Sequence, residues 1–477
     1  MARLYAGAAR VCVNTPGAVV SDPLYAKALL LKSEDKTAAI VSLDYICLGG
    51  GIGALSDGFF EKLKARVGEL GVDLLICGTT HTHTPGAMYV TDESVTGGIC
   101  AALRQAGEKL EPARIGFGVG RDESFLINRT LTLKDGSAWS IRQAHPCPPD
   151  AEIAAVEDAD ADIDILRVDR LDGSCLCVLF TFGCHPLLGY AHDLVTANFP
   201  GIAERIVEEQ TGAVAMLLQS SGGDVTEVSY KDYDHPKCCD GPGMTLGLAV
   251  LKALRTIRTE AAEDFKTAVL PVSFPRRTDI PKVREELLRQ REALFARLGN
   301  CPLDFKTFLP LYMKYLTSPE YPLDHAYAYM KEEAMGRHQL RDQDGINRGN
   351  IQKYLENIRI MEQLSRLATT LETLKWHENY NAASGQSHIA GEVAALRLGD
   401  ALFVTAPVEP LSAIGRRIKS FSEKQVFFIG YANGYMHYGA PAEAYNNGGY
   451  ETIECLLGSG WQAVYEDAVR ELMADLP

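Results

Sequence analysis

The sequence has no long apolar run and no cluster of basic residues, and these two absences exclude whole classes of protein. None of its segments reaches about 20 uncharged apolar residues, the length that a helix needs to span a bilayer. The 47 Lys and Arg residues are outnumbered by 62 Asp and Glu residues, a formal net charge of −15, and no stretch is basic enough to follow a phosphate backbone. We therefore expect neither nucleic acid as a partner nor a stable association with a membrane.

A secretion signal and a disulfide framework are missing as well. Residues 1–20 interrupt their apolar positions with Arg10 and Asn14, so they lack the apolar core of a signal peptide. The 12 cysteines are scattered without the spacing of a disulfide scaffold. These features predict a cytoplasmic protein whose thiols are mostly reduced and packed as small apolar side chains.

What is present is the composition of an ordinary globular protein. The 477 residues are 46% hydrophobic and 23% charged, which is enough apolar material for a large core. Helical patterns alternate with short apolar runs of the kind that form strands buried on both faces. These runs are residues 37–49, 72–79, 175–186 and 212–224. The alternation predicts an α/β fold with a mixed β-sheet core and flanking helices.

The middle of the chain changes in character. Residues 281–377 are rich in Arg, Glu and Leu at helical spacing, which predicts a helical insertion. The insertion is either a structural buttress or a lid over a pocket. The stretch "GEVAALRLGDALFVTAP" then predicts a hairpin with Gly399 and Asp400 at its turn. We therefore divide the chain into a core domain of residues 1–280 and 378–477 and the insertion between them.

Two histidines stand one residue apart in "GTTHTHTPG", where an apolar run gives way to a turn. In an extended strand, side chains two residues apart project from the same face, so His81 and His83 could bind one ion. A polar loop, or a buried histidine with its hydrogen bonds made, explains the pair as well. A metal site therefore needs further ligands elsewhere in the chain.

Two more ends of apolar runs carry candidate ligands. His185 ends the run in "FTFGCHP", and Glu409 follows the run in "LFVTAPVEP". Folds of the α/β class place functional side chains at strand ends. Glu409 could instead cap a helix that starts near Leu411. Two histidines and one carboxylate are the protein ligands of a catalytic zinc ion, which keeps one position for water.

Several motifs, taken in order, resemble the catalytic domain of the neutral ceramidases, zinc amidases that cleave the N-acyl bond of ceramide. They are "YAGAARVCVNTP", "THTHTPG", "CHP", "NFPG", "QSSGGDVT", "APVEPLSAIGRR" and "YANGYMHYGAPAEAYNNGGYE". The resemblance covers most of the chain outside the helical insertion. It implies a ceramidase-like fold with Zn²⁺ as the cofactor.

By this resemblance the zinc ligands are His81, His185, Glu409 and Tyr438. His83, Arg129 and Tyr450 then lie beside the metal and contact the reacting group, so that His83 serves the substrate oxygen rather than the ion. Zinc lowers the pKa of bound water from roughly 15.7 to about 7, which makes hydroxide available to attack an amide carbonyl. These three side chains could stabilise the oxyanion, and either His83 or Tyr450 would protonate the leaving amine.

One motif departs from the family. The pattern "GDVSP" reads "GDVTE" here, with Thr226 in place of serine and Glu227 in place of proline. Threonine keeps a hydroxyl, so a catalytic role for Thr226 stays open, but its methyl group narrows the pocket. Equally, "SSGGDVT" could be a tight turn whose Asp224 caps the next helix.

The segment "HPKCCD" carries a second group of possible ligands, His235, Cys238 and Cys239. Adjacent cysteines cannot easily face one ion, and no second pair has matching spacing. We interpret them as reduced thiols in a loop.

These features predict a zinc-dependent hydrolase of a linear amide bond. Ceramide is a membrane lipid, and an acidic chain without a membrane-facing stretch favours a soluble small-molecule amide as substrate. Two other functions stay open: a metal-binding regulatory relative without turnover, and a metal-independent hydrolase with Thr226 or a cysteine as nucleophile. The sequence gives neither half of the substrate, and it leaves open whether the chain forms a homo-oligomer.

Overall fold

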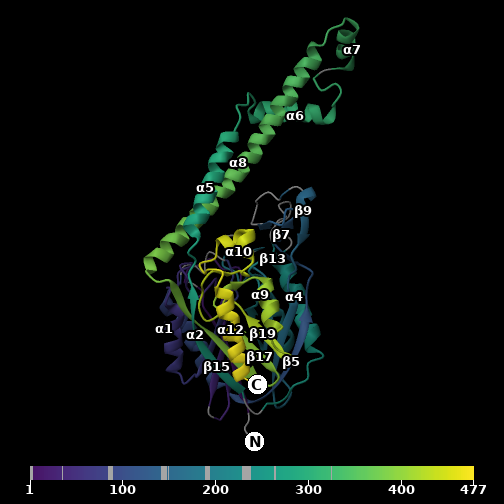
Figure 1. Ribbon diagram of the computed structural model, residues 1–477. Coiled ribbons are helices and arrows are strands. Elements are labelled where there is room, and N and C mark those ends of the chain that lie inside the picture. Colours follow the sequence, from purple (N-terminus) through teal and green to yellow (C-terminus); the bar gives the residue numbers. More distant parts are fainter. Residues whose placement is uncertain are drawn as a thin grey trace. The chain divides into compact units, whose positions relative to one another are not determined.

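The computed structural model divides into two compact units, residues 1–278 with 381–477 and residues 279–380 (Figure 1). It describes residues 4–14, 16–34, 36–83, 90–140, 148, 150–188, 194–227, 238–262, 265–323 and 325–476. The first unit contains the β-sheets, and the second is helical.

A nine-stranded mixed sheet is the larger layer of the first unit. Its strands follow the order β12-β11-β10-β5-β1-β2-β3-β4, and β14 pairs with β5. Most neighbours are antiparallel, but β3 with β4 and β11 with β12 are parallel. The bounds are β1 Tyr5–Cys12, β2 Tyr25–Lys32, β3 Thr37–Leu43, β4 Leu74–Thr79, β5 Glu111–Arg121, β10 Asp162–Arg170, β11 Cys175–Phe182, β12 Val214–Gln219 and β14 Glu260–Ala261. The predicted mixed sheet is confirmed.

The sheet curls until its two ends meet. Strand β12, at one end of the order, contacts β3 and β4 at the other. The Ser42 hydroxyl on β3 donates to Leu217 O on β12, and Lys27 Nζ on β2 donates to Ala215 O at 2.9 Å. Helix α1 (Phe59–Gly68) crosses from β3 to β4, and α3 (Asn198–Thr211) crosses from β11 to β12. The curl therefore brings the carboxyl ends of β4 and β11 together.

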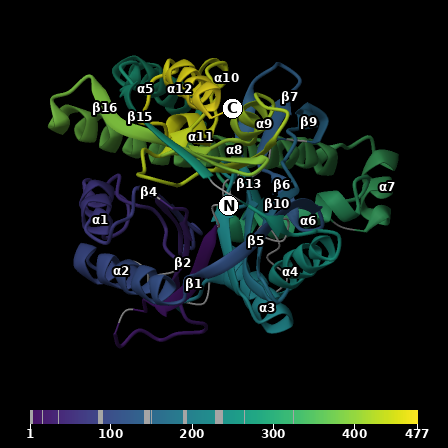
Figure 2. The ribbon, with the colours of Figure 1, turned by 90° about the horizontal axis from the view of Figure 1, so that it is seen from below.

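A four-stranded sheet with the order β15-β16-β17-β19 packs on the first sheet. Its strands are β15 Phe265–Pro275, β16 His388–Leu398, β17 Ala401–Thr405 and β19 Gln425–Ile429. Helices α2 (Asp92–Glu108) and α4 (Asp240–Leu254) join α1 and α3 on the nine-stranded sheet, and α9 (Ser412–Lys419) and α12 (Trp461–Asp475) cover the other sheet (Figure 2). The layers are thus helix, sheet, sheet and helix.

The apolar runs that form β3, β4, β11 and β12 are buried on both faces, as the sequence predicts. In β3, Ala38 and Ile40 belong to the core between the two sheets. Ala39 and Val41 belong to the core formed with α1 and α2. The run of apolar side chains from Ala38 to Val41 therefore replaces the alternation of a half-exposed strand.

The predicted hairpin is present as well. Strands β16 and β17 pair antiparallel, with Leu398 opposite Ala401. Between them, Gly399 has a φ of +55°, a left-handed conformation that glycine adopts without steric cost. The expected turn at Gly399 and Asp400 is confirmed.

Short paired segments complete the first unit. Strand β13 pairs with β6, β18 pairs with β20, and β8, β7 and β9 form a three-stranded sheet. Their bounds are β6 Leu126–Asn128, β7 Thr130–Leu133, β8 Ala138–Ser140, β9 Ile153–Val156, β13 Val225–Glu227, β18 Glu409–Pro410 and β20 Tyr438–Gly439. The short helices are α10 Ala444–Asn447 and α11 Tyr450–Ile453, with a 3-10 turn at Asp150–Glu152.

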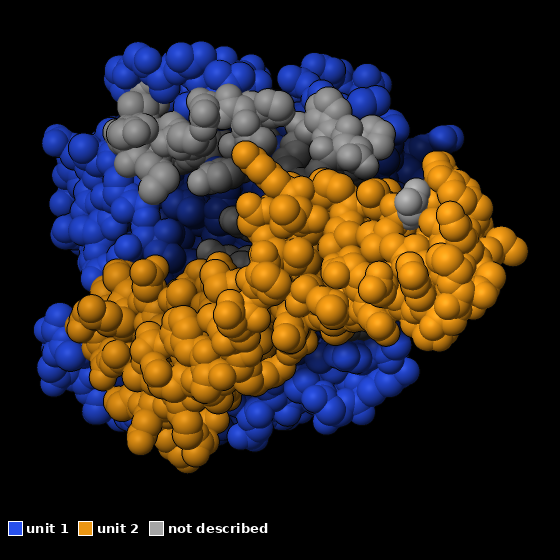
Figure 3. Space-filling model, turned by 90° about the horizontal axis from the view of Figure 1, so that it is seen from above, with its two compact units in different colours: residues 1–278, 381–477 blue, residues 279–380 orange. Residues whose placement is uncertain are grey.

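The second unit, drawn in orange in Figure 3, is helical. Its helices are α5 Ile280–Arg297, α6 Phe305–Thr317, α7 Ala326–Ala334 and α8 Gln339–Ser384, of which the last residues, 381–384, belong to the first unit. Helix α5 packs on α8 through Leu294 and Ile360, and α6 packs on α8 through Phe308 and Ile351. Across the described part of the whole chain, no helix combines the length and the apolar character that crossing a bilayer requires.

Candidate metal centre

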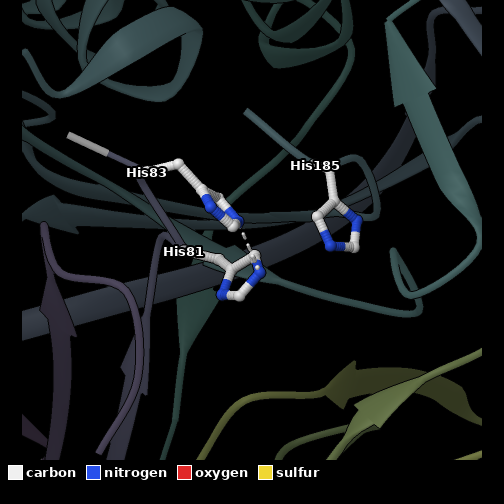
Figure 4. Close-up of side chains that lie close together, drawn as sticks. All are labelled: His81, His83 and His185. Atoms are coloured by element: carbon white, nitrogen blue, oxygen red, sulfur yellow. Dashed lines mark hydrogen bonds between the residues drawn. The ribbon is translucent and has the colours of Figure 1, made fainter. Parts of the chain in front are cut away.

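Side chains from three distant segments meet at the carboxyl ends of β4 and β11. His81 and His83 follow β4, His185 follows β11, and Glu409 begins β18. The ring centroids of His81 and His185 are 4.8 Å apart, and those of His81 and His83 are 4.6 Å apart (Figure 4). His81, His185 and Glu409 are at most 3% exposed. We call His81, His83, His185 and Glu409 the histidine cluster.

The approach of His81 to His83 does not come from strand alternation, so the extended geometry expected for this pair is wrong. Strand β4 ends at Thr79, and His81 has a φ of +61°, in the left-handed region that non-glycine residues rarely adopt. The two side chains still meet, with 3.0 Å between their Nε2 atoms. A strained backbone of this kind costs about 1–3 kcal/mol and is typical of functional sites.

Hydrogen bonds orient the imidazoles of His81 and His185, which are both buried. His81 Nδ1 lies 2.7 Å from Ile46 O, and His185 Nδ1 lies 2.6 Å from Gly222 O. Because a carbonyl oxygen only accepts, each Nδ1 carries a proton, and in the neutral ring each Nε2 presents a lone pair. The Nε2 atoms of His81 and His185 lie 3.5 and 3.2 Å from the two carboxylate oxygens of Glu409. Histidines that bind metals are oriented in this way by a second hydrogen bond.

The electrostatics of the histidine cluster favour a cation. Burial lowers the pKa of His81 to about 4, so its ring is neutral at pH 7. Burial raises the pKa of Glu409, but His81, His185 and the Tyr435 hydroxyl outweigh it and hold this pKa well below its usual range. While His185 is neutral, Glu409 Oε2 has no hydrogen-bond donor among the described residues. An ionised carboxylate that faces imidazole lone pairs is a donor set that fits zinc.

Tyr438, the expected fourth ligand, lies at the edge of the cluster. Its Oη is 3.3 Å from His185 Nε2 and accepts a hydrogen bond of 2.8 Å from Arg129 Nη2. Burial raises the pKa of Tyr438 well above its usual range, although the positive charge of Arg129 acts in the opposite direction. Arg129 also donates to Gly223 O and to Glu451 Oε1, each at 2.7 Å. The guanidinium group is therefore fixed beside Tyr438.

Tyr450 belongs to the same group of side chains. It is the first residue of α11 and is half-buried. Its ring centroid is 5.7 Å from that of Tyr438 and 5.4 Å from Arg129 Cζ. The phenol thus stands next to the guanidinium group rather than among the histidines.

Thr226 is connected to the cluster through the backbone. It lies on β13 and forms a parallel bridge with His185. Its side chain is buried, and its hydroxyl donates to Glu227 Oε2 at 3.2 Å. The structure thus links all the predicted site residues by contacts around one end of the nine-stranded sheet.

Two capping roles considered for these segments are wrong. Glu409 does not cap α9, because the first N–H of that helix, on Ser412, donates to Asp224 Oδ1 at 2.8 Å. Asp224 likewise caps no helix that follows it in the chain, since β13 comes next. Asp224 therefore supports α9, and the Glu409 carboxylate faces the imidazoles of the histidine cluster instead.

Sequence reasoning missed two residues that hold the site together. The Tyr435 hydroxyl donates to Glu409 Oε1, and the Glu451 carboxylate holds Arg129. Both stand inside the last motif of the family resemblance, "YANGYMHYGAPAEAYNNGGYE". Their positions in the sequence could have indicated them, because Tyr435 is three residues before Tyr438 and Glu451 is next to Tyr450.

The segment "HPKCCD" is described only in part. His235 lies outside the described residues. Cys238 is exposed, with its Sγ 3.1 Å from Asp240 Oδ2, and Cys239 is half-buried. Both are free thiols, like the other cysteines in the described ranges.

The fold and the centre define an α/β protein with two packed sheets and a buried set of histidine and glutamate donors at the strand ends. The chain has the fold of the neutral ceramidases. It is similar to the neutral ceramidase from Pseudomonas aeruginosa, with a TM-score of 0.62 and 15% identity, over 100% of this chain and 75% of that one. It is also similar to a structure described as a ceramidase complexed with C2, with a TM-score of 0.64 and 16% identity, over 100% of this chain and 76% of that one. No protein-family model and no curated protein matches the chain. The expected resemblance is thus confirmed for the fold.

Proposed function

We propose that the protein is a zinc-dependent hydrolase that cleaves a linear amide bond and releases an acid and an amine. The observation that carries the proposal is the orientation of His81 and His185, whose Nδ1 protons are held by carbonyl oxygens while both Nε2 lone pairs face the Glu409 carboxylate. The fold shared with two ceramidases supports the same class of reaction.

His81, His185 and Glu409 would hold the ion, with Tyr438 as the fourth ligand. When bound, zinc lowers the pKa of water to about 7 and polarises the amide carbonyl. Glu409 supplies the negative charge, and the Tyr435 hydroxyl fixes its orientation. The carbonyl groups of Ile46 and Gly222 keep the imidazoles in the ligating tautomer.

His83 is suited to the substrate oxygen. Burial and the neighbouring imidazoles lower its pKa well below the usual range, so the ring is neutral at pH 7. Since His81 Nε2 presents a lone pair, the 3.0 Å contact between the two Nε2 atoms requires the proton to be on His83 Nε2. With zinc on His81 Nε2, this N–H would be free for the reacting carbonyl, and His83 is a candidate to protonate the leaving amine, for which Tyr450 is the alternative.

The proposal includes a soluble small-molecule amide as substrate and a cytoplasmic location. Its support is the net charge of −15, which disfavours approach to an anionic bilayer.

Metal analysis followed by a hydrolysis screen tests the proposal. We expect about one zinc per chain and hydrolysis of soluble N-acyl amino acids or other small amides, lost on chelation and restored by Zn²⁺. H81A should lose both metal and activity, whereas H388N, at an exposed histidine, should keep both. Stoichiometric zinc without turnover across the panel would indicate a regulatory relative, and activity confined to short-chain ceramides would contradict the soluble substrate.

The hydrogen bond from Thr226 to Glu227 favours a second candidate, a metal-independent hydrolase. A carboxylate beside a hydroxyl could accept its proton and make Thr226 a nucleophile. This candidate requires activity that survives exhaustive chelation and is abolished by T226V. Loss of activity on chelation excludes it.

A further inference from the structure

Glu227 is a buried carboxyl group for which the proposed reaction gives no role. It occupies the position where the family pattern has proline, and its side chain is 0% exposed. Burying a carboxyl group costs several kcal/mol unless hydrogen bonds compensate it. The contacts that compensate Glu227 therefore indicate what the side chain does.

The Glu227 carboxylate joins two segments of the site. Its Oε1 accepts hydrogen bonds from the backbone N–H groups of Leu187 at 2.9 Å and Leu188 at 3.3 Å. These residues come directly after His185 and Pro186. Its Oε2 accepts the hydroxyl of Thr226, which is bridged to His185 through the backbone. The Glu227 side chain thus holds both the backbone that follows His185 and the side chain of Thr226.

The same contacts set the direction of the Thr226 hydroxyl. An ionised carboxylate only accepts, so Thr226 must donate its single proton to Glu227. The lone pairs of Thr226 Oγ1 are then left as acceptors. A hydroxyl without such a partner would be free to donate instead. Burial raises the pKa of Glu227 to about 7, so the carboxylate is ionised at a pH well above that value.

We propose that Glu227 is a positioning residue, which anchors the segment after His185 and fixes the Thr226 hydroxyl as a hydrogen-bond acceptor. The second part rests on the proposed amide hydrolysis. As a water oxygen bonds to the carbonyl carbon and the C–N bond breaks, the nitrogen keeps the electron pair, takes a proton from His83 or Tyr450 and leaves as an amine. The N–H of a secondary amide could donate to an acceptor at Thr226, which is bridged to His185, whereas a tertiary amide has no N–H until its nitrogen is protonated. Such an acceptor therefore favours secondary amides over tertiary amides.

Amide hydrogen exchange in the zinc-loaded, full-length protein tests the anchoring without any need for turnover. E227A removes the acceptor of the Leu187 and Leu188 N–H groups, and we expect both to exchange at least about tenfold faster. E227Q is the matched control, because its amide oxygen can still accept both bonds. Equal exchange in the wild type and E227A would overturn the anchoring.

A double-mutant cycle at pH 8.5 tests the acceptor role. In E227Q the amide NH₂ takes the place of Oε2 and donates to Thr226, which reverses the hydrogen bond at constant volume. We expect kcat/KM for a secondary amide to fall about tenfold with the zinc content unchanged. In a T226V background, which has no hydroxyl, the same E227Q change should alter kcat/KM less than about twofold.

The outcomes separate the two proposals. A structural role alone would lower kcat/KM equally in both backgrounds, and that result, or wild-type activity in E227Q, would overturn the acceptor role. T226S keeps the hydroxyl and should remain sensitive to E227Q. If the wild-type protein hydrolyses no amide, the proposed function and the acceptor role both fail, while the exchange measurement still decides whether Glu227 anchors the segment.

Discussion

His185 Nε2 and Glu409 Oε2 lie 3.2 Å apart, although the two residues follow strands of different sheets. His185 comes after β11 of the nine-stranded sheet, and Glu409 comes after β17 of the four-stranded sheet. Tyr438, which contacts His185, follows β19 of that second sheet. One sheet thus supplies the imidazoles and the other supplies the carboxylate and the phenol, so the centre depends on the packing between them.

Replacing the carboxylate should remove the metal. E409Q keeps the volume of the side chain but lacks the charge, and we expect zinc affinity to fall by at least about 100-fold. Competition with a fluorescent chelator measures the affinity. E423Q changes an exposed glutamate and is the matched control. Wild-type affinity in E409Q would contradict the assignment of Glu409 as a ligand.

Removing the Tyr435 phenol, which orients the Glu409 carboxylate, should weaken zinc binding less than E409Q does. Y435F loses the hydrogen bond to Glu409 Oε1, and we expect zinc affinity to fall by about tenfold. Y465F is matched to it, because the Tyr465 hydroxyl donates to Thr405 O at 3.0 Å and contacts no residue of the histidine cluster in the described structure. Both variants should lose about 1 kcal/mol of stability, but only Y435F should change the affinity.

The metal-free protein should lose stability as the pH falls from about 6.5 to about 4. The pKa of His81 is about 4 in the folded protein against an ordinary value of 6.5, so in this range the unfolded chain binds a proton that the folded chain does not. The contribution of His81 to the free energy of unfolding is complete above pH 6.5 and is lost on acidification. Its size is about 3 kcal/mol. Urea unfolding in EDTA at pH 7 and pH 4.5 measures it.

H81N removes the titrating group and should show a smaller drop between these two pH values. H388N, at an exposed position, should follow the wild type. An equal drop in the wild type and H81N would mean that His81 is not the group responsible.

The buried ion pair beneath α3 should matter more for stability than an exposed one. Lys27 Nζ lies 2.8 Å from Glu204 Oε2, with both side chains at most 4% exposed. K27M leaves Glu204 buried without its partner, and we expect a loss of about 3–5 kcal/mol in urea unfolding. K62M breaks a pair with Asp92 in which the lysine is 65% exposed, and it should cost less than about 1 kcal/mol. Similar losses in both variants would contradict this account.

The sequence could indicate the candidate ligands but not the geometry that joins them. His185 and Glu409 were recognisable because each follows an apolar run, and this is a local signal. Their distance depends on the curl of the nine-stranded sheet and on its packing against the second sheet, which no local pattern encodes. The left-handed backbone of His81 was equally hidden, since "GTTHTHTPG" reads as the end of an extended strand. Tyr435 and Glu451 were missed because their partners, Glu409 and Arg129, are distant in the chain.

Because the sheet curls until its ends meet, an ion bound at the histidine cluster would join those two ends. The line along which β12 meets β3 and β4 is closed by side-chain contacts rather than by a continuous ladder of strand pairing. His81 follows the strand on one side of this seam, and His185 follows β11 beside the strand on the other. A cation bound by both histidines would therefore link the two ends of the sheet. Its removal should loosen β4 and β12 before the central strands β1 and β5, so that amide exchange in the apo protein would begin at the seam.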